Sequence, residues 1–201
     1  MFVYGEKETA YLAAQDAKLG AAMERIGHIS RETETDLFAS LTCQIIGQQI
    51  SNAAYESVKG RLTARIGGIT PDAVIALGAD GLRSCGMSMR KAENILAAAK
   101  AFADGEIDVD ALRCMPDDKV IAALTALGGV GVWTAQMLLI FCLERPDVLS
   151  YGDFGIRKGL MRLHGLETLT KAEFEVYRAR YSPYGTVAGF YLWAIAAGEG
   201  L

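Results

Sequence analysis

The sequence has 201 residues, which is enough for one ordinary domain or two small, closely packed ones. Its formal net charge of −4 argues against a protein that coats nucleic acid non-specifically, because such binding depends on Lys and Arg that neutralise phosphates. The four cysteines lie too far apart for the closely spaced ligand pairs of zinc or iron–sulfur sites. We therefore expect reduced thiols, no metal centre, and only local, shape-dependent contacts with DNA.

The N-terminal residues contain no basic stretch followed by an apolar one, and no run of about 18 apolar residues occurs in the chain. This predicts a soluble intracellular protein, cytoplasmic and, in a bacterium, associated with the nucleoid. Residues 145–190 carry seven Lys or Arg against five Asp or Glu, whereas residues 1–40 carry four against seven. The basic excess favours the second half for a nucleic-acid face, although an ordinary solvated surface often shows such an imbalance.

Apolar residues recur at helical spacing along almost the whole chain, and no segment alternates with period two, which predicts an all-α protein. Thr70 before Pro71 and, further on, Ser88 are typical of helix starts. Thr170 and Glu173 form a capping-box pattern. The predicted helices span residues 6–26, 33–49, 52–66, 71–77, 89–104, 117–126, 132–143, 154–164, 171–181 and 186–197.

The stretch LTALGGVGVWTAQMLLIF predicts a helix, a tight turn and a second helix that starts at once. Gly129 and Gly131 permit positive φ angles and leave no side chain between the backbone and a ligand. Because the next helix begins with free N–H groups, the turn suits a DNA phosphate, which fixes register without reading sequence. Taken alone, the glycines are also typical of an ordinary turn between helices.

Asp153 follows Gly152 about twenty residues after this turn, directly before a predicted helix with Ile156 and Leu160 on one face. The helix dipole and the free N–H groups at such a position favour an ionised carboxylate. Taken alone, Asp153 is an ordinary helix cap.

Together, the hairpin and the aspartate resemble the helix-hairpin-helix DNA glycosylase superfamily, named for its glycine/proline-rich hairpin and its aspartate. The resemblance implies that Asp153 is catalytic, either stabilising a cationic sugar in the transition state or activating water. A proline usually stands where this chain has Gly128, so a looser turn is expected. The resemblance assigns phosphate binding to Gly128, Gly129, Val130, Gly131 and Thr134.

The residue at position 133 is informative about the type of reaction within that superfamily. Members that also cut the DNA strand carry a lysine nucleophile there, whereas this chain has Trp133, which cannot form a Schiff base. The cysteine cluster of the endonuclease III branch is also missing. We therefore expect base removal without lyase activity and without an iron–sulfur cluster.

Three further segments, LTCQIIGQQISNAA, LRSCGMSMRKAENI and PYGTVAGFYLWAIA, resemble the 3-methyladenine DNA glycosylase II branch. This resemblance implies that Gln49 is the wedge that fills the gap left by a flipped base. It places four side chains at or near the base pocket, although core packing also explains the aromatic ones. These four are Gln48, Trp133, Met137 and Trp193. Where this chain has Met137, the family often has an aromatic residue.

The resemblance implies a monofunctional glycosylase that flips and excises alkylated purines such as 3-methyladenine from duplex DNA. Aromatic faces attract a cationic base, which is already a good leaving group. The implied fold has two helical subdomains with the active-site cleft between them: a middle bundle of residues 35–125, and a second lobe of residues 1–34 and 126–201 that carries the hairpin and Asp153. The expected enzyme is a monomer that needs no cofactor, although the hairpin can hold a monovalent cation.

Three other interpretations stay open. The chain could excise a deaminated or oxidised base, which would need directed hydrogen bonds from side chains such as Gln48 and Gln136. It could bind DNA structures without catalysis, although an intact Asp153 argues against this. It could also be an unrelated helical bundle, which three matching segments in the right order make hard to sustain.

Overall fold

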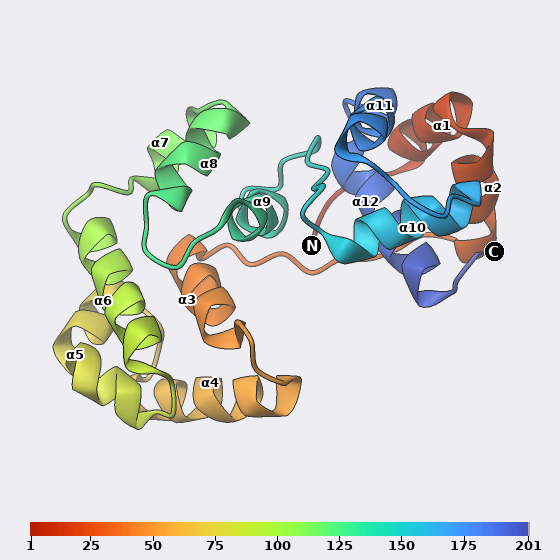
Figure 1. Cartoon of the computed structure of the whole chain (residues 1–201). Helices are drawn as coiled ribbons and strands as arrows, with labels where there is room; N and C mark the ends of the chain where they lie inside the picture. Colours follow the sequence, from red (N-terminus) through yellow and green to blue (C-terminus); the bar gives the residue numbers. More distant parts are fainter. Residues whose placement is uncertain (201) are drawn as a thin grey trace. The chain divides into compact units, whose positions relative to one another are not determined.

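The computed structural model describes residues 1–200, which form helices joined by short loops (Figure 1). No strand occurs among these residues, so the predicted all-α class is confirmed. The helices are α1 (Glu6–Gln15), α2 (Ala17–Ile26), α3 (Leu37–Gly47), α4 (Asn52–Ile66), α5 (Pro71–Ser84), α6 (Met89–Ala103), α7 (Val109–Cys114), α8 (Asp117–Thr125), α9 (Val132–Phe141), α10 (Phe154–His164), α11 (Lys171–Tyr181) and α12 (Gly185–Ala197).

The predicted helix starts are confirmed by their hydrogen bonds. The Thr70 side chain caps α5 by accepting from a backbone N–H of the first turn, and Ser88 does the same for α6. At α11 the capping box is complete, because Thr170 Oγ1 accepts from the N–H of Glu173 while Glu173 Oε2 accepts from the N–H of Thr170. Each cap satisfies an N–H group that the helix itself leaves without a partner.

Three predicted helices have clearly different extents in the structure, and the one expected over residues 33–49 spans only Leu37–Gly47. The helix expected over residues 6–26 is broken at Asp16, whose extended backbone and side-chain cap start α2 as a separate helix. The helix expected over residues 71–77 continues to Ser84 across a kink at Gly78, where φ is +69°. Helix α7 was not predicted at all; it has only six residues, too few for a visible periodicity, and Asp108 caps it.

The described chain divides into two compact units. The first unit comprises Met1–Thr33 and the segment from Leu139 onward, and the second unit is Glu34–Leu138. The first border lies next to the expected one at residues 34 and 35. The second border falls inside α9, between Leu138 and Leu139. The hairpin is therefore grouped with the middle bundle, whereas the sequence analysis placed it in the lobe that carries Asp153.

In the second unit, α5 lies along α6, and α3 and α4 complete the bundle (Figure 1). Its core consists of fully buried aliphatic side chains, including Leu41, Ile45, Leu62, Leu82 and Ile95. This bundle supports two loops that concern function: the α3–α4 loop and the hairpin between α8 and α9.

In the first unit, α10 packs closely against α12 (Figure 1). The close approach depends on Gly159, since a Cβ atom there would lie 2.8 Å from the carbonyl carbon of Leu192. Helix α12 is buried on nearly all sides and includes the fully buried Phe190. This packing fixes the start of α10, where Asp153 lies, against the middle of α12.

Candidate active site

Asp153 is the residue that caps α10. Its Oδ1 atom accepts a hydrogen bond of 2.9 Å from the N–H of Ile156, and the predicted position at a helix N-terminus is therefore confirmed. The residue is only 7% exposed. A carboxylate at this position is stabilised by the helix dipole and is largely withdrawn from bulk water, which strengthens its electrostatic effect on a nearby cation.

Trp193 on α12 makes a second hydrogen bond to the same oxygen. Its Nε1 atom donates to Asp153 Oδ1 at 3.0 Å. Gly155 makes room for this contact, because a Cβ atom there would lie 2.8 Å from Trp193 Cδ1. Two N–H donors on one oxygen fix the orientation of the carboxylate. The sequence suggested an aromatic pocket role for Trp193 and gave no sign of this hydrogen bond.

The indole ring of Trp193 is itself held by neighbouring aromatic rings. It stacks on Phe141 with ring centroids 6.0 Å apart and on Phe190 with centroids 6.1 Å apart. Because these two rings of the first unit contact the indole and also lie 6.4 Å from each other, Trp193 is positioned before any ligand arrives.

Phe154, directly after Asp153, is a candidate that the sequence analysis did not single out. Its side chain is 68% exposed, which is unusual for an aromatic residue at the start of a well-packed helix. An exposed ring next to the carboxylate is suited to stacking on a base. The signal was present in the sequence as an aromatic residue immediately after the Gly-Asp pair.

The hairpin between α8 and α9 has a positive φ angle at Gly129 and not at Gly131, so one of the two glycines uses the freedom that the sequence suggested. Gly129 has a φ of +80°, and Val130 N–H donates to Leu127 O at 3.2 Å to close the turn. Gly131 has open space where a Cβ atom would lie. This leaves the backbone before α9 accessible to a phosphate. Thr134 is 6% exposed, so its side chain offers little surface to a ligand.

Gly128 occupies the position where the family that this hairpin resembles usually has a proline. A Cβ atom there would lie 2.7 Å from Oδ1 of Asn94, a residue of α6. Asn94 therefore takes up the space that a larger residue at position 128 would need. A larger residue at position 128 would require the Asn94 side chain to move.

The α3–α4 loop lies against this hairpin, because Gln48 Nε2 donates to Gly129 O at 2.9 Å. The neighbouring Gln49 is exposed and has a φ of +57°, a conformation that residues other than glycine rarely adopt. Gln49 is thus an exposed residue on a constrained loop, as a wedge must be. Its role as a wedge stays a prediction.

The other two predicted pocket residues differ in exposure. Trp133, at the start of α9, is 45% exposed, whereas Met137, one turn later, is 5% exposed. Trp133 can therefore offer its ring to a base, and Met137 mainly fills space in the second unit. Asp153 and Trp193 belong to the first unit, and the predicted cleft between subdomains stays a prediction.

Within residues 1–200, no group of three or more His, Cys, Asp or Glu side chains is arranged to hold a metal ion. Within the same residues, the cysteines at positions 43, 85, 114 and 142 form no disulfide bond. In the same part of the chain, no helix has the length and apolar character needed to cross a membrane.

Comparison with known proteins agrees with this geometry. The model of a family described as the HhH-GPD superfamily of base excision DNA repair proteins matches residues 42–182. DNA-3-methyladenine glycosylase 1 of Schizosaccharomyces pombe is 30% identical over 168 residues, which cover 81% of this chain and 72% of that protein. DNA-3-methyladenine glycosylase 2 of Escherichia coli is 25% identical over 79% of this chain and 57% of its own length.

Two solved structures have the same fold. The crystal structure of a DNA-3-methyladenine glycosidase from Bacillus halodurans superimposes with a TM-score of 0.88 and 34% identity, covering 95% of this chain and 89% of that one. The 3-methyladenine DNA glycosylase of Schizosaccharomyces pombe, solved in complex with abasic DNA, has a TM-score of 0.81 and 27% identity, covering 94% of this chain and 95% of that one.

Proposed function

Because the chain belongs to the HhH-GPD superfamily of base excision DNA repair proteins, we propose that it is a monofunctional DNA glycosylase that excises alkylated purines, such as 3-methyladenine, from duplex DNA. The observation that carries the proposal is the Asp153 carboxylate, buried at the start of α10 and oriented by two N–H donors. The 3-methyladenine glycosylases among its relatives support the choice of substrate.

The proposed reaction breaks the N-glycosidic bond between the damaged base and the deoxyribose. Positive charge develops on the sugar as this bond lengthens, and a fixed carboxylate stabilises it. The same group can orient or deprotonate the attacking water. An alkylated purine is cationic and leaves readily, so the enzyme needs no general acid. The base must leave the helical stack, since the bond is otherwise out of reach.

Aromatic side chains account for the proposed preference for cationic bases. Trp133 and Phe154 are exposed and can present their ring faces to a flipped base. A ring face attracts a cation by about 0.5–2 kcal/mol, depending on how far water is excluded. Such a site accepts several alkylated purines, because it recognises charge and flatness rather than a pattern of hydrogen bonds.

DNA binding is proposed to use two loops of the second unit. The backbone of the hairpin, at Gly129 and Gly131, receives a phosphate, and Gln49 enters the gap left by the flipped base. Binding through backbone N–H groups fits a chain whose net charge is −4, since these groups need no excess of Lys and Arg.

The chemistry proposed here requires no cofactor, because a carboxylate and water suffice for the hydrolysis. A monovalent cation at the hairpin stays a prediction; carbonyl oxygens are suitable ligands, but Leu127 O and Gly129 O already accept hydrogen bonds there and would have to share them. We also propose that the enzyme acts as a monomer in the cytoplasm, or at the nucleoid of a bacterial cell.

The direct test is base release by the protein and its Asp153→Asn variant from methylated duplex DNA. Asparagine caps helices as well as aspartate does, so the variant should fold and bind DNA while losing the negative charge. We expect the parent to release 3-methyladenine and to leave abasic sites that break only after alkali, and the variant to release base at least about a hundredfold more slowly. Strand breaks without alkali would contradict the monofunctional assignment.

If neither protein releases 3-methyladenine, the same pair should be assayed on duplexes with deaminated or oxidised bases. Release of such a base would replace the proposed substrate. Binding to abasic DNA with no release from any substrate would instead indicate a protein that recognises DNA structure without catalysis.

A further inference from the structure

Lys91, in the first turn of α6, forms hydrogen bonds within the second unit through its charged ammonium group. Its Nζ atom donates to Ile46 O at 2.8 Å and to Gln48 O at 2.5 Å. These carbonyl groups lie at the C-terminal end of α3, where a helix leaves its last acceptors without partners and favours a positive charge. Lys91 therefore closes α3 at the point where the chain turns into the α3–α4 loop.

The loop borders a cavity. This cavity has a volume of about 230 Å³ and is lined by residues that include Gln48, Gln49, Val58, Met87 and Lys91. Gln49 also has a backbone conformation that persists only where the surroundings hold it. The hydrogen bonds of Lys91 and the bond from Gln48 Nε2 to Gly129 O therefore support the path of the loop beside this cavity.

The same face of α6 also supports the hairpin. Asn94, one turn after Lys91, lies against Gly128 and Gly129, and Gln48 Nε2 donates to Gly129 O at 2.9 Å. A continuous set of contacts thus runs from Lys91 through Gln48 to the hairpin. The start of α6 holds both of the loops that were assigned to DNA binding.

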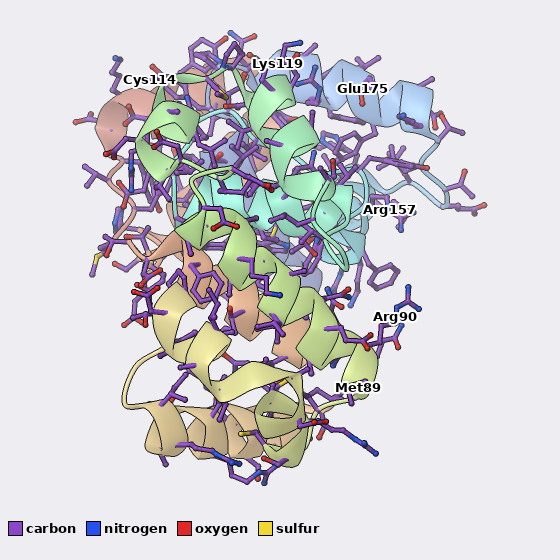
Figure 2. The ribbon with its side chains drawn as sticks, turned by 90° about the vertical axis from the view of Figure 1, so that its left-hand side faces the viewer. Met89, Arg90, Cys114, Lys119, Arg157 and Glu175 are labelled. Atoms are coloured by element: carbon purple, nitrogen blue, oxygen red, sulfur yellow. The ribbon has the colours of Figure 1, made fainter. Side chains whose placement is uncertain are left out.

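We propose that Lys91 is a positioning residue that sets the Gln48–Gln49 loop against the hairpin, so that wedge and phosphate-binding backbone engage one DNA duplex together. The inference rests on the proposed function, since it assumes that these two loops meet DNA. The neighbouring Arg90 is different, because it is exposed and extends away from the start of α6 (Figure 2). Arg90 is available to a phosphate, whereas the ammonium group of Lys91 is engaged by backbone carbonyls.

The test compares Lys91→Met with the parent and with Lys100→Met. Methionine keeps an unbranched apolar side chain but has no donor. Lys100 lies exposed at the other end of α6, so its variant makes the same change of charge without touching either loop. Affinities are measured by fluorescence anisotropy for an intact duplex and for one containing a stable abasic analogue. A 2-aminopurine next to the abasic analogue reports insertion of the wedge, and urea unfolding reports stability.

We expect the ratio of affinities for abasic and intact DNA to be about tenfold smaller for Lys91→Met than for the parent. A loss of this size is expected when charge-assisted hydrogen bonds are removed. The 2-aminopurine signal should fall with it, while affinity for intact duplex changes less than about twofold and Lys100→Met behaves like the parent in its preference. If Lys91→Met does not fold, Gln48→Ala, which removes only the link to Gly129 O, must show the same selective loss.

Each contrary outcome has a distinct meaning. A parent protein that releases 3-methyladenine but has no preference for abasic DNA would overturn the inference alone, whereas a parent that also releases no base would refute the proposed function. If the parent prefers abasic DNA and a folded Lys91→Met variant keeps that preference, the role of Lys91 is overturned. If Lys91→Met does not fold and Gln48→Ala keeps the preference, the role is overturned as well. An equal loss for both duplexes with a weaker salt dependence would make Lys91 a phosphate contact, which also overturns the inference.

Discussion

Replacement of Trp193 by phenylalanine tests whether the indole N–H orients the catalytic carboxylate. Phenylalanine keeps an aromatic ring against Phe141 and Phe190 but removes the donor that lies 3.0 Å from Asp153 Oδ1. The N–H of Ile156 still reaches the same oxygen, so the helix cap survives. The change therefore removes one of two donors and leaves the fold of the first unit in place.

The expected size of the effect follows from the character of this hydrogen bond. A hydrogen bond to a charged group contributes about 1.5–3 kcal/mol. Trp193 is partly exposed and Ile156 N–H remains, so the lower end of that range applies. At about 1.4 kcal/mol for each factor of ten, the rate of base release should fall about tenfold.

The assay is single-turnover release of 3-methyladenine with enzyme in excess, alongside the affinity for abasic DNA, which should stay unchanged. A double-mutant cycle gives the decisive comparison: in the Asp153→Asn background, Trp193→Phe should change the residual rate by less than about twofold, since the two residues act as one unit. A tenfold loss in both backgrounds would mean that Trp193 acts on the base itself, and a variant with the parent's rate would refute its role altogether.

Two further predictions concern stability. Gly159→Ala should lower the free energy of unfolding by about 2 kcal/mol in a urea titration, because the new Cβ atom would clash with the backbone of Leu192. Gly60→Ala is the control: there is open space around Gly60, so this variant should raise the free energy of unfolding by about 0.5–1 kcal/mol. Burial, opposed in part by Asp16, lowers the pKa of His164 below its usual 6.5. The unfolded chain therefore binds the proton more readily, so stability should decline as the pH falls through about 6.5, and His164→Gln should lose that part of the decline.

Local signals made most of the fold predictable. The caps at Ser88 and Thr170 were readable because a cap depends on residues only three positions apart. The break at Asp16 was missed because the apolar periodicity continues on both sides of it, and an isolated polar residue is common inside a helix. The whole of α7 was missed because six residues hold less than two helical turns.

The site was predictable only where its chemistry is contiguous in the sequence. Asp153 and the hairpin glycines are recognisable because each lies in a short segment with a fixed order of residues. The contact between Asp153 and Trp193 joins residues 40 positions apart and depends on the packing of α10 on α12. The segment LRSCGMSMRKAENI, which contains Lys91, was recognisable in the sequence. The role of Lys91 was not, because its partners are backbone carbonyls, which carry no signature in the sequence.

Two helix N-termini in this chain serve opposite purposes, and the difference bears on how an acidic protein can bind DNA. At α10 the N–H groups hold the protein's own carboxylate, that of Asp153, and so prepare a negative charge for a cationic transition state. Ahead of α9, Gly131 leaves open space instead, so the N–H groups there can face a phosphate from outside. Backbone N–H groups do not enter the formal charge, and a net charge of −4 is therefore compatible with a local phosphate site.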